Sequence, residues 1–140
     1  MKGKKIMFTV SREFTFCYGH RLLDYNGKCA HPHGHNAKVL IELQNEALDQ
    51  DGMVLDFTEL KRTIGQWLED FLDHQMILQD GDPLVPVLRE MGEPVFLMSE
   101  KPTAENLAKL VFEKSGEFGF PVAAVTFWET EKCCAEYRTD

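Results

Sequence analysis

Metal-ligating and nucleophilic side chains are concentrated in one short segment, Cys29 to Asn36, which reads Cys-Ala-His-Pro-His-Gly-His-Asn. Side chains at positions i and i+2 of a strand point to the same face, so His33 and His35 can bind one metal ion together. His20 lies shortly upstream. Three imidazoles with an open fourth position describe a catalytic zinc site, because water or substrate needs a place to bind. The alternative is a histidine pair at a strand end that makes ordinary hydrogen bonds.

Cys29 precedes His33 by four residues, so we expect its thiol close to imidazoles and to a metal ion. These neighbours favour the thiolate, which is the reactive form of cysteine. Cys29 could instead be a fourth zinc ligand, which would close the site and make it structural. The spacing alone does not decide between these two roles.

Two further groups could carry chemistry. Asp73 can orient the imidazole of His74 and make it a general base, but only if the helix ends there, since helical neighbours point in different directions. Otherwise His74 is a helix-end residue favoured by the dipole. Glu129 continues the inward apolar row of Val125 and Phe127. A buried carboxylate needs a partner, such as a ligand with two adjacent N–H groups, unless its strand end reaches solvent.

Two long strands are needed to position the histidines. Apolar residues alternate from Lys5 to His20 and again from His33 to Leu43, and each histidine continues an apolar row. The residues between 21 and 32 read as a loop. If the strands pair antiparallel, His20 ends one strand where His33 and His35 begin the other.

The rest of the chain supplies helices and a second hairpin. Helical spacing follows an N-cap at Asp56 and ends near Asp73, and a second helix begins at Pro102-Thr103. Residues 79–101 read as an irregular connection, with a short helix at 84–91 and an extended piece at 95–98. Residues 122–130 and 133–138 read as the final hairpin. The order ββααββ predicts an α+β fold, a four-stranded antiparallel sheet with two helices on one face and open edges that invite subunit pairing.

Composition narrows the class of protein. The chain has 140 residues and a net charge of −8, which argues against a nucleic-acid partner. No apolar stretch approaches the length of a membrane span, so we expect no membrane partner. The four cysteines do not form a disulfide framework, which favours a cytoplasmic, reduced protein.

Six motifs in order resemble the 6-pyruvoyl-tetrahydropterin synthase family over nearly the whole chain. They are Phe14-x5-His20-Arg21-Leu22, Cys29-x3-His33-Gly34-His35-Asn36, Met53-Val54-Leu55-Asp56-Phe57, Leu72-Asp73-His74, Pro102-Thr103-Ala104-Glu105-Asn106-Leu107 and Glu129-Thr130. The Cys-x3-His-Gly-His spacing is most similar to the bacterial branch, the 6-carboxy-5,6,7,8-tetrahydropterin synthases of queuosine biosynthesis.

The resemblance implies a tunnelling fold (T-fold) over residues 1–140 as one pterin synthase-like domain, assembled from trimers into a homohexamer. It implies a lyase that binds zinc through His20, His33 and His35. It implies that Cys29 transfers protons with Asp73 and His74 of a neighbouring subunit. It also implies that Glu129 anchors the pterin ring, with Thr103 and Glu105 nearby.

The implied substrate is 7,8-dihydroneopterin triphosphate, and the implied products are 6-carboxy-5,6,7,8-tetrahydropterin, acetaldehyde and triphosphate. Two alternatives remain: the pyruvoyl-type elimination of triphosphate, and a non-catalytic zinc-stabilised oligomer that binds a pterin or purine. Tyr18-Gly19 departs from the small alanines usual before His20, and the 79–101 connection is longer than in compact members. Arg21, Lys28 and His31 are the candidate cations for the triphosphate.

Overall fold

The centre of the structure is a long antiparallel hairpin. In the computed structural model, which describes residues 3–140, β1 (Phe8–His20) pairs with β2 (His33–Asn45) along its whole length. Phe8 lies opposite Asn45 and His20 lies opposite His33. This register confirms the predicted hairpin and brings the histidine-bearing ends of both strands together.

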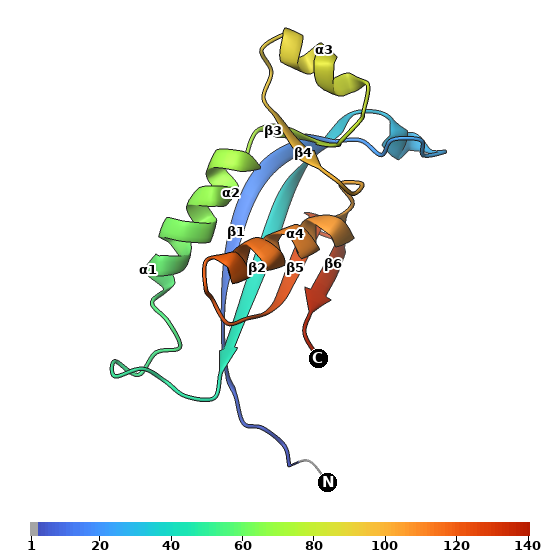
Figure 1. Cartoon of the computed structure of the whole chain (residues 1–140). Helices are drawn as coiled ribbons and strands as arrows, with labels where there is room; N and C mark the ends of the chain where they lie inside the picture. Colours follow the sequence, from blue (N-terminus) through green and yellow to red (C-terminus); the bar gives the residue numbers. More distant parts are fainter. Residues whose placement is uncertain (1–2) are drawn as a thin grey trace.

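Four more strands extend this hairpin on its two sides (Figure 1). β5 (Val122–Thr130) pairs antiparallel with β2, and β6 (Cys133–Arg138) pairs antiparallel with β5. On the other side β3 (Gln75–Gln79) runs parallel to β1, and β4 (Val95–Met98) runs parallel to β3. The order is β4-β3-β1-β2-β5-β6. The four predicted antiparallel strands are confirmed, and the sheet also contains two short parallel strands, β3 and β4, that were not predicted to belong to it.

The two longer helical segments lie over one face of the sheet, and a short helix lies beyond one end of it (Figure 1). α1 (Phe57–Leu60) continues through a π-helical stretch, Lys61–Gly65, into α2 (Gln66–Phe71). The second predicted helix is α4 (Ala104–Glu117), and the short helix in the connection is α3 (Leu84–Glu90). A single 3-10 turn, Lys28–Ala30, lies in the loop between β1 and β2. The α+β prediction is therefore confirmed.

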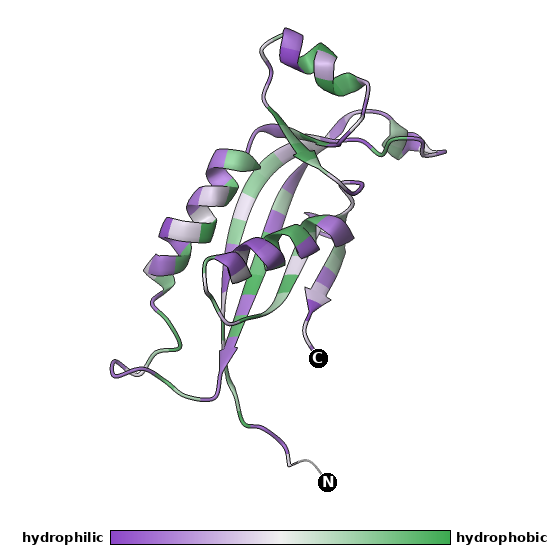
Figure 2. Ribbon diagram, viewed as in Figure 1, coloured by the Kyte–Doolittle hydropathy of each residue, from purple (hydrophilic) through white to green (hydrophobic). Residues whose placement is uncertain are grey.

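The core lies between the helices and the sheet, and alternation along the strands builds it. Along β2 the apolar residues on one face are buried and their neighbours are more exposed. Figure 2 shows this alternation as bands of opposite hydropathy along the strands. The fully buried side chains from both layers include Val39, Ile41, Leu43, Leu60, Ile64, Leu107, Val111, Val125 and Phe127. The histidines continue this inward face at the end of the hairpin.

Among residues 3–140, the helices are all too short or too polar to cross a lipid bilayer.

Candidate metal centre

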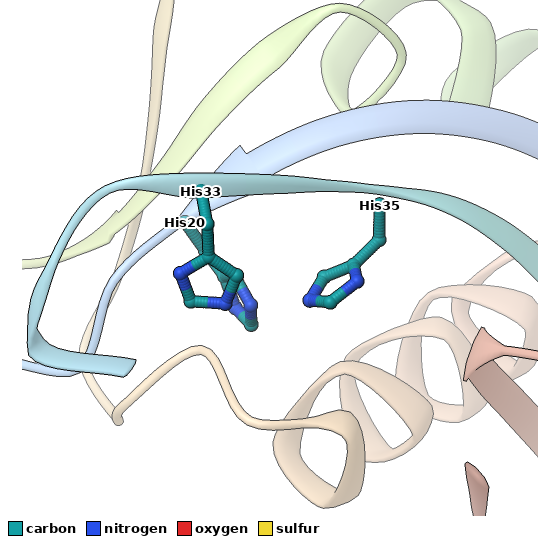
Figure 3. A group of neighbouring side chains, drawn as sticks. All are labelled: His20, His33 and His35. Atoms are coloured by element: carbon teal, nitrogen blue, oxygen red, sulfur yellow. The ribbon is translucent and has the colours of Figure 1, made fainter. Parts of the chain in front are cut away.

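Three histidines converge at the end of the central hairpin. Figure 3 shows the rings of His20, His33 and His35 pointing toward one another beneath the strands. One ring nitrogen from each residue lies within 4.8 Å of the other two. The ring centroids are 4.5 Å apart for His20 and His33, and 5.0 Å apart for each of the other two pairs. The strand register has therefore gathered a set of nitrogen donors that can hold one metal ion.

Backbone carbonyls fix the orientation of two of these rings. Nδ1 of His20 lies 2.7 Å from the carbonyl oxygen of Pro102, and Nδ1 of His33 lies 2.7 Å from that of His31. A carbonyl only accepts hydrogen bonds, so each Nδ1 carries the proton and each Nε2 keeps a lone pair. The second nitrogen of a metal-binding histidine is commonly held in this way.

Burial favours the neutral form of His20 and His35. It lowers the pKa of His20 to about 4, although the hydrogen bond that His20 donates to the carbonyl of Pro102 opposes the shift, and it lowers the pKa of His35. At neutral pH His20 is therefore unprotonated. The Nε2 atoms of His20 and His35 are buried and have no hydrogen-bond partner. Buried polar atoms normally have a partner, so these two atoms indicate a bound group.

Glu129 faces this cluster from β5. Its Oε1 lies 3.9 Å from Nε2 of His20, and its side chain is partly buried. The carboxylate therefore points to the same space as the histidines. This agrees with the sequence, in which Glu129 lies two residues after Phe127 and so shares its inward face of the strand. Its role in binding a ligand stays a prediction.

Cys29 lies outside the cluster. It is exposed in the 3-10 turn, where its carbonyl accepts a 2.8 Å hydrogen bond from the backbone N–H of Leu22. Within the part of the chain that the structure describes, the candidate metal group consists of the three histidines alone. The geometry of these residues therefore gives no support to the closed, four-ligand site.

Asp73 and His74 form the expected pair at the edge of β1. α2 ends at Phe71, and His74 adopts a left-handed backbone with φ 59°. Nδ1 of His74 then lies 3.0 Å from Oδ1 of Asp73. The same oxygen accepts a 3.0 Å hydrogen bond from the backbone N–H of Cys17. The helix end thus supplies the geometry that a regular helix would not, but it leaves the pair outside the histidine cluster.

Thr103 and Glu105 lie at the start of α4, next to the carbonyl that orients His20. The Thr103 hydroxyl oxygen accepts a 3.2 Å hydrogen bond from the backbone N–H of Asn106 and so caps the helix. Glu105 is exposed in the first turn. Thr103 directly follows Pro102, whose carbonyl holds His20, and the contact of Thr103 and Glu105 with a substrate stays a prediction.

Arg21 is not available as a cation for a triphosphate. Its Nε donates to Asp82 at 2.9 Å, and its Nη2 donates to the other oxygen of the same buried carboxylate. Asp82 was not among the predicted site residues, although an Asp before Pro83 at the start of a predicted helix is a capping signal, and its Oδ1 does accept a hydrogen bond from the backbone N–H of Leu84. Lys28 and His31 both lie in the exposed loop between β1 and β2.

The sequence profile of the family described as 6-pyruvoyl tetrahydropterin synthase matches residues 9–140. The chain belongs to this family and has its α+β tunnelling fold.

A 6-carboxy-5,6,7,8-tetrahydropterin synthase of Rickettsia bellii is 31% identical over 93% of this chain and 99% of its own length. A probable 6-carboxy-5,6,7,8-tetrahydropterin synthase of Halobacterium salinarum is 37% identical over 69% of this chain, a match that spans 61% of the relative. The solved structure of Caenorhabditis elegans 6-pyruvoyl tetrahydropterin synthase has a TM-score of 0.73 at 27% identity, and the match covers 99% of this chain and 100% of that one.

Proposed function

We propose that the protein is a zinc-dependent 6-carboxy-5,6,7,8-tetrahydropterin synthase. It would convert 7,8-dihydroneopterin triphosphate to 6-carboxy-5,6,7,8-tetrahydropterin with release of acetaldehyde and triphosphate. The observation that carries the proposal is the convergence of three imidazoles whose buried Nε2 atoms, at His20 and His35, lack partners. Two observations support the 6-carboxy product over the pyruvoyl product. One is the similarity to the Rickettsia bellii enzyme named for this activity, and the other is the Cys-x3-His spacing between Cys29 and His33.

The residues present fit a zinc ion. Neutral imidazoles with Nδ1 held by a carbonyl are typical zinc ligands, and His20 and His33 have this arrangement. We infer that His20, His33 and His35 would hold the ion. When bound, zinc would polarise oxygen atoms of the substrate side chain and so acidify the neighbouring carbon–hydrogen bonds.

The base in this proposal is His74. Nδ1 of His74 lies 3.0 Å from Oδ1 of Asp73, and a carboxylate there favours the proton on Nδ1, so Nε2 of His74 would keep a lone pair that can take a proton. The His74 side chain is 78% exposed, and Cys29 is also exposed. Cys29 would supply the partner proton-transfer group. Since neither residue joins the histidine cluster of its own chain, we propose that a neighbouring copy completes the site.

The assembly in this proposal is a hexamer built as a dimer of trimers. The pairing of β3 with β1 covers only Tyr18 to His20, and β6 is an edge strand with one partner. Most of β1 and the outer edge of β6 therefore offer unpaired backbone groups to neighbouring copies.

The pterin ring would be held by Glu129, which can accept two charge-assisted hydrogen bonds from adjacent N–H groups of the ring. Thr103 caps α4 through its oxygen, so its hydroxyl hydrogen is still able to bind the ligand. Glu105 would act beside it. We also propose that residues 1–140 act as one domain in a reducing cytoplasm, where the four free cysteines stay reduced, and that the product feeds queuosine biosynthesis.

The test is to incubate the zinc-loaded protein with 7,8-dihydroneopterin triphosphate and to identify the products by mass. Acetaldehyde and a carboxylated tetrahydropterin would support the proposal. A pyruvoyl-type product would select the other branch, and unchanged substrate would refute the activity.

A cysteine variant tests the role of Cys29. Cys29→Ala should keep zinc and bind pterin but lose turnover, whereas Cys133→Ala, which changes another exposed cysteine, should behave as wild type. Loss of zinc from Cys29→Ala would instead make Cys29 a ligand and favour a structural metal site.

A further inference from the structure

Tyr18 is a buried residue to which the proposed reaction gives no role. It lies on the inner face of β1, two residues before His20, and its side chain is 4% exposed. Its hydroxyl oxygen has no hydrogen-bond partner. A buried polar group without a partner costs about 1–3 kcal/mol, so a native structure rarely keeps one without a reason.

The unpartnered atoms of this chain occur together. In residues 3–140, the buried side-chain nitrogen and oxygen atoms without a partner are Nε2 of His20, Nε2 of His35 and the hydroxyl of Tyr18. The Tyr18 ring centroid lies 5.0 Å from that of His20 and 5.6 Å from that of His35, its partner in the strand register. A zinc ion at the histidines would satisfy the two nitrogen atoms, and a molecule bound at that ion would lie beside the Tyr18 ring, where it can pair with the hydroxyl.

The other aromatic rings beside Tyr18 are apolar. The rings of Phe127 and Phe16 lie 5.7 Å and 5.8 Å away and offer no hydrogen-bond acceptor. The ordinary pKa of a tyrosine is about 10, so the phenol is protonated at neutral pH and can act as a donor. What it lacks is an acceptor, and an oxygen atom of a ligand at the histidines would provide one.

We propose that Tyr18 donates a hydrogen bond to an oxygen atom on the side chain of the bound pterin, and that it thereby selects pterins with an oxygenated side chain. This inference rests on the proposed function, because it takes a reduced pterin as the ligand. It adds a specificity-determining residue to the three histidines, and it does not require Tyr18 to change its protonation state.

The test compares two ligands in the zinc-loaded protein by equilibrium binding. One is 7,8-dihydroneopterin, whose side chain carries hydroxyl groups, and the other is 6-methyl-7,8-dihydropterin, whose side chain has none. Tyr18→Phe removes the hydroxyl and keeps the ring. It should weaken binding of dihydroneopterin about 3- to 10-fold, the loss expected for one hydrogen bond, and leave binding of the methyl compound unchanged.

Two further readouts separate this role from a structural one. Tyr18→Phe should keep one zinc per chain, and without ligand its melting temperature should be equal to or higher than that of wild type, since an unsatisfied polar group is removed. Tyr137→Phe changes an exposed tyrosine on β6 and is the matched control, with no effect expected on either ligand.

The inference is overturned if Tyr18→Phe binds both pterins as wild type does, or if it weakens both equally. A lower melting temperature without ligand, or a failure to fold, would overturn it as well, because the hydroxyl would then stabilise the fold itself. If the wild-type protein binds neither pterin, the proposed function fails and this inference fails with it.

Discussion

The buried ion pair between Arg21 and Asp82 should contribute strongly to stability, because it joins the residue after His20 to the segment that carries α3. The Asp82 side chain has no exposed surface, and it accepts hydrogen bonds from Arg21 and from the backbone N–H of Leu84. Breaking a buried pair by removing one partner costs about 3–5 kcal/mol. The Arg21 side chain is 22% exposed, so water recovers part of that cost. We expect Asp82→Asn to lower the free energy of unfolding by about 2–3 kcal/mol.

The same pair predicts a pH dependence with a definite sign. The hydrogen bonds from Arg21 hold the pKa of Asp82 below its ordinary value of 3.8. A group whose pKa is lowered by folding stabilises the protein above its unfolded pKa and loses this effect as the pH falls through the folded value. The difference in the free energy of unfolding between wild type and Asp82→Asn should therefore have its full size at pH 7. It should become smaller below about pH 4.

Urea unfolding followed by circular dichroism at several pH values between 7 and 3 measures this difference. Asp80→Asn, an exposed position in the same segment, is the matched control and should change stability by less than about 0.5 kcal/mol. The reasoning is refuted if Asp82→Asn is as stable as wild type at pH 7. A difference that stays constant down to pH 3 would show that the charge of Asp82 is not its source.

Three further variants test the site and its support. Thr103→Ala removes the cap of α4 and should lower stability by about 1 kcal/mol in thermal unfolding; an unchanged melting temperature would contradict this. His35→Ala removes one of three nitrogen donors, so metal analysis after gel filtration should show well under one zinc per chain, and full retention would mean that other residues bind the ion. Glu129→Gln should keep zinc but bind dihydroneopterin about 10-fold more weakly, as expected for a lost charge-assisted hydrogen bond, and equal affinity would remove Glu129 from the ligand site.

The central hairpin and its histidines could be predicted because the signal is local. Alternation with a period of two fixes which side chains share a face, and it placed His20, His33 and His35 on the buried one. The same alternation predicted that Glu129 lies on the face that points toward these histidines. A register slip by one residue would move every side chain to the other face, so the hydrophobic pattern strongly constrains such a site.

The parts that were missed depend on contacts between distant residues. β3 has only five residues, and its parallel pairing with β1 and β4 joins segments far apart in the sequence, so periodicity could not assign it. Asp82 binds Arg21 across 61 positions, which made Arg21 look like a free cation. Tyr18 was visible as an unusual residue before His20, but its unsatisfied hydroxyl appears only once the neighbouring rings are in place.

The most direct test of the central claim is zinc K-edge X-ray absorption on the purified zinc-loaded protein. Three imidazoles and an exchangeable position predict a first shell of nitrogen and oxygen atoms at about 2.0–2.1 Å, with the outer-shell scattering of histidine rings. A sulfur atom at about 2.3 Å would show that a cysteine closes the site. That result, or a protein that retains no zinc, would contradict an open metal centre at His20, His33 and His35.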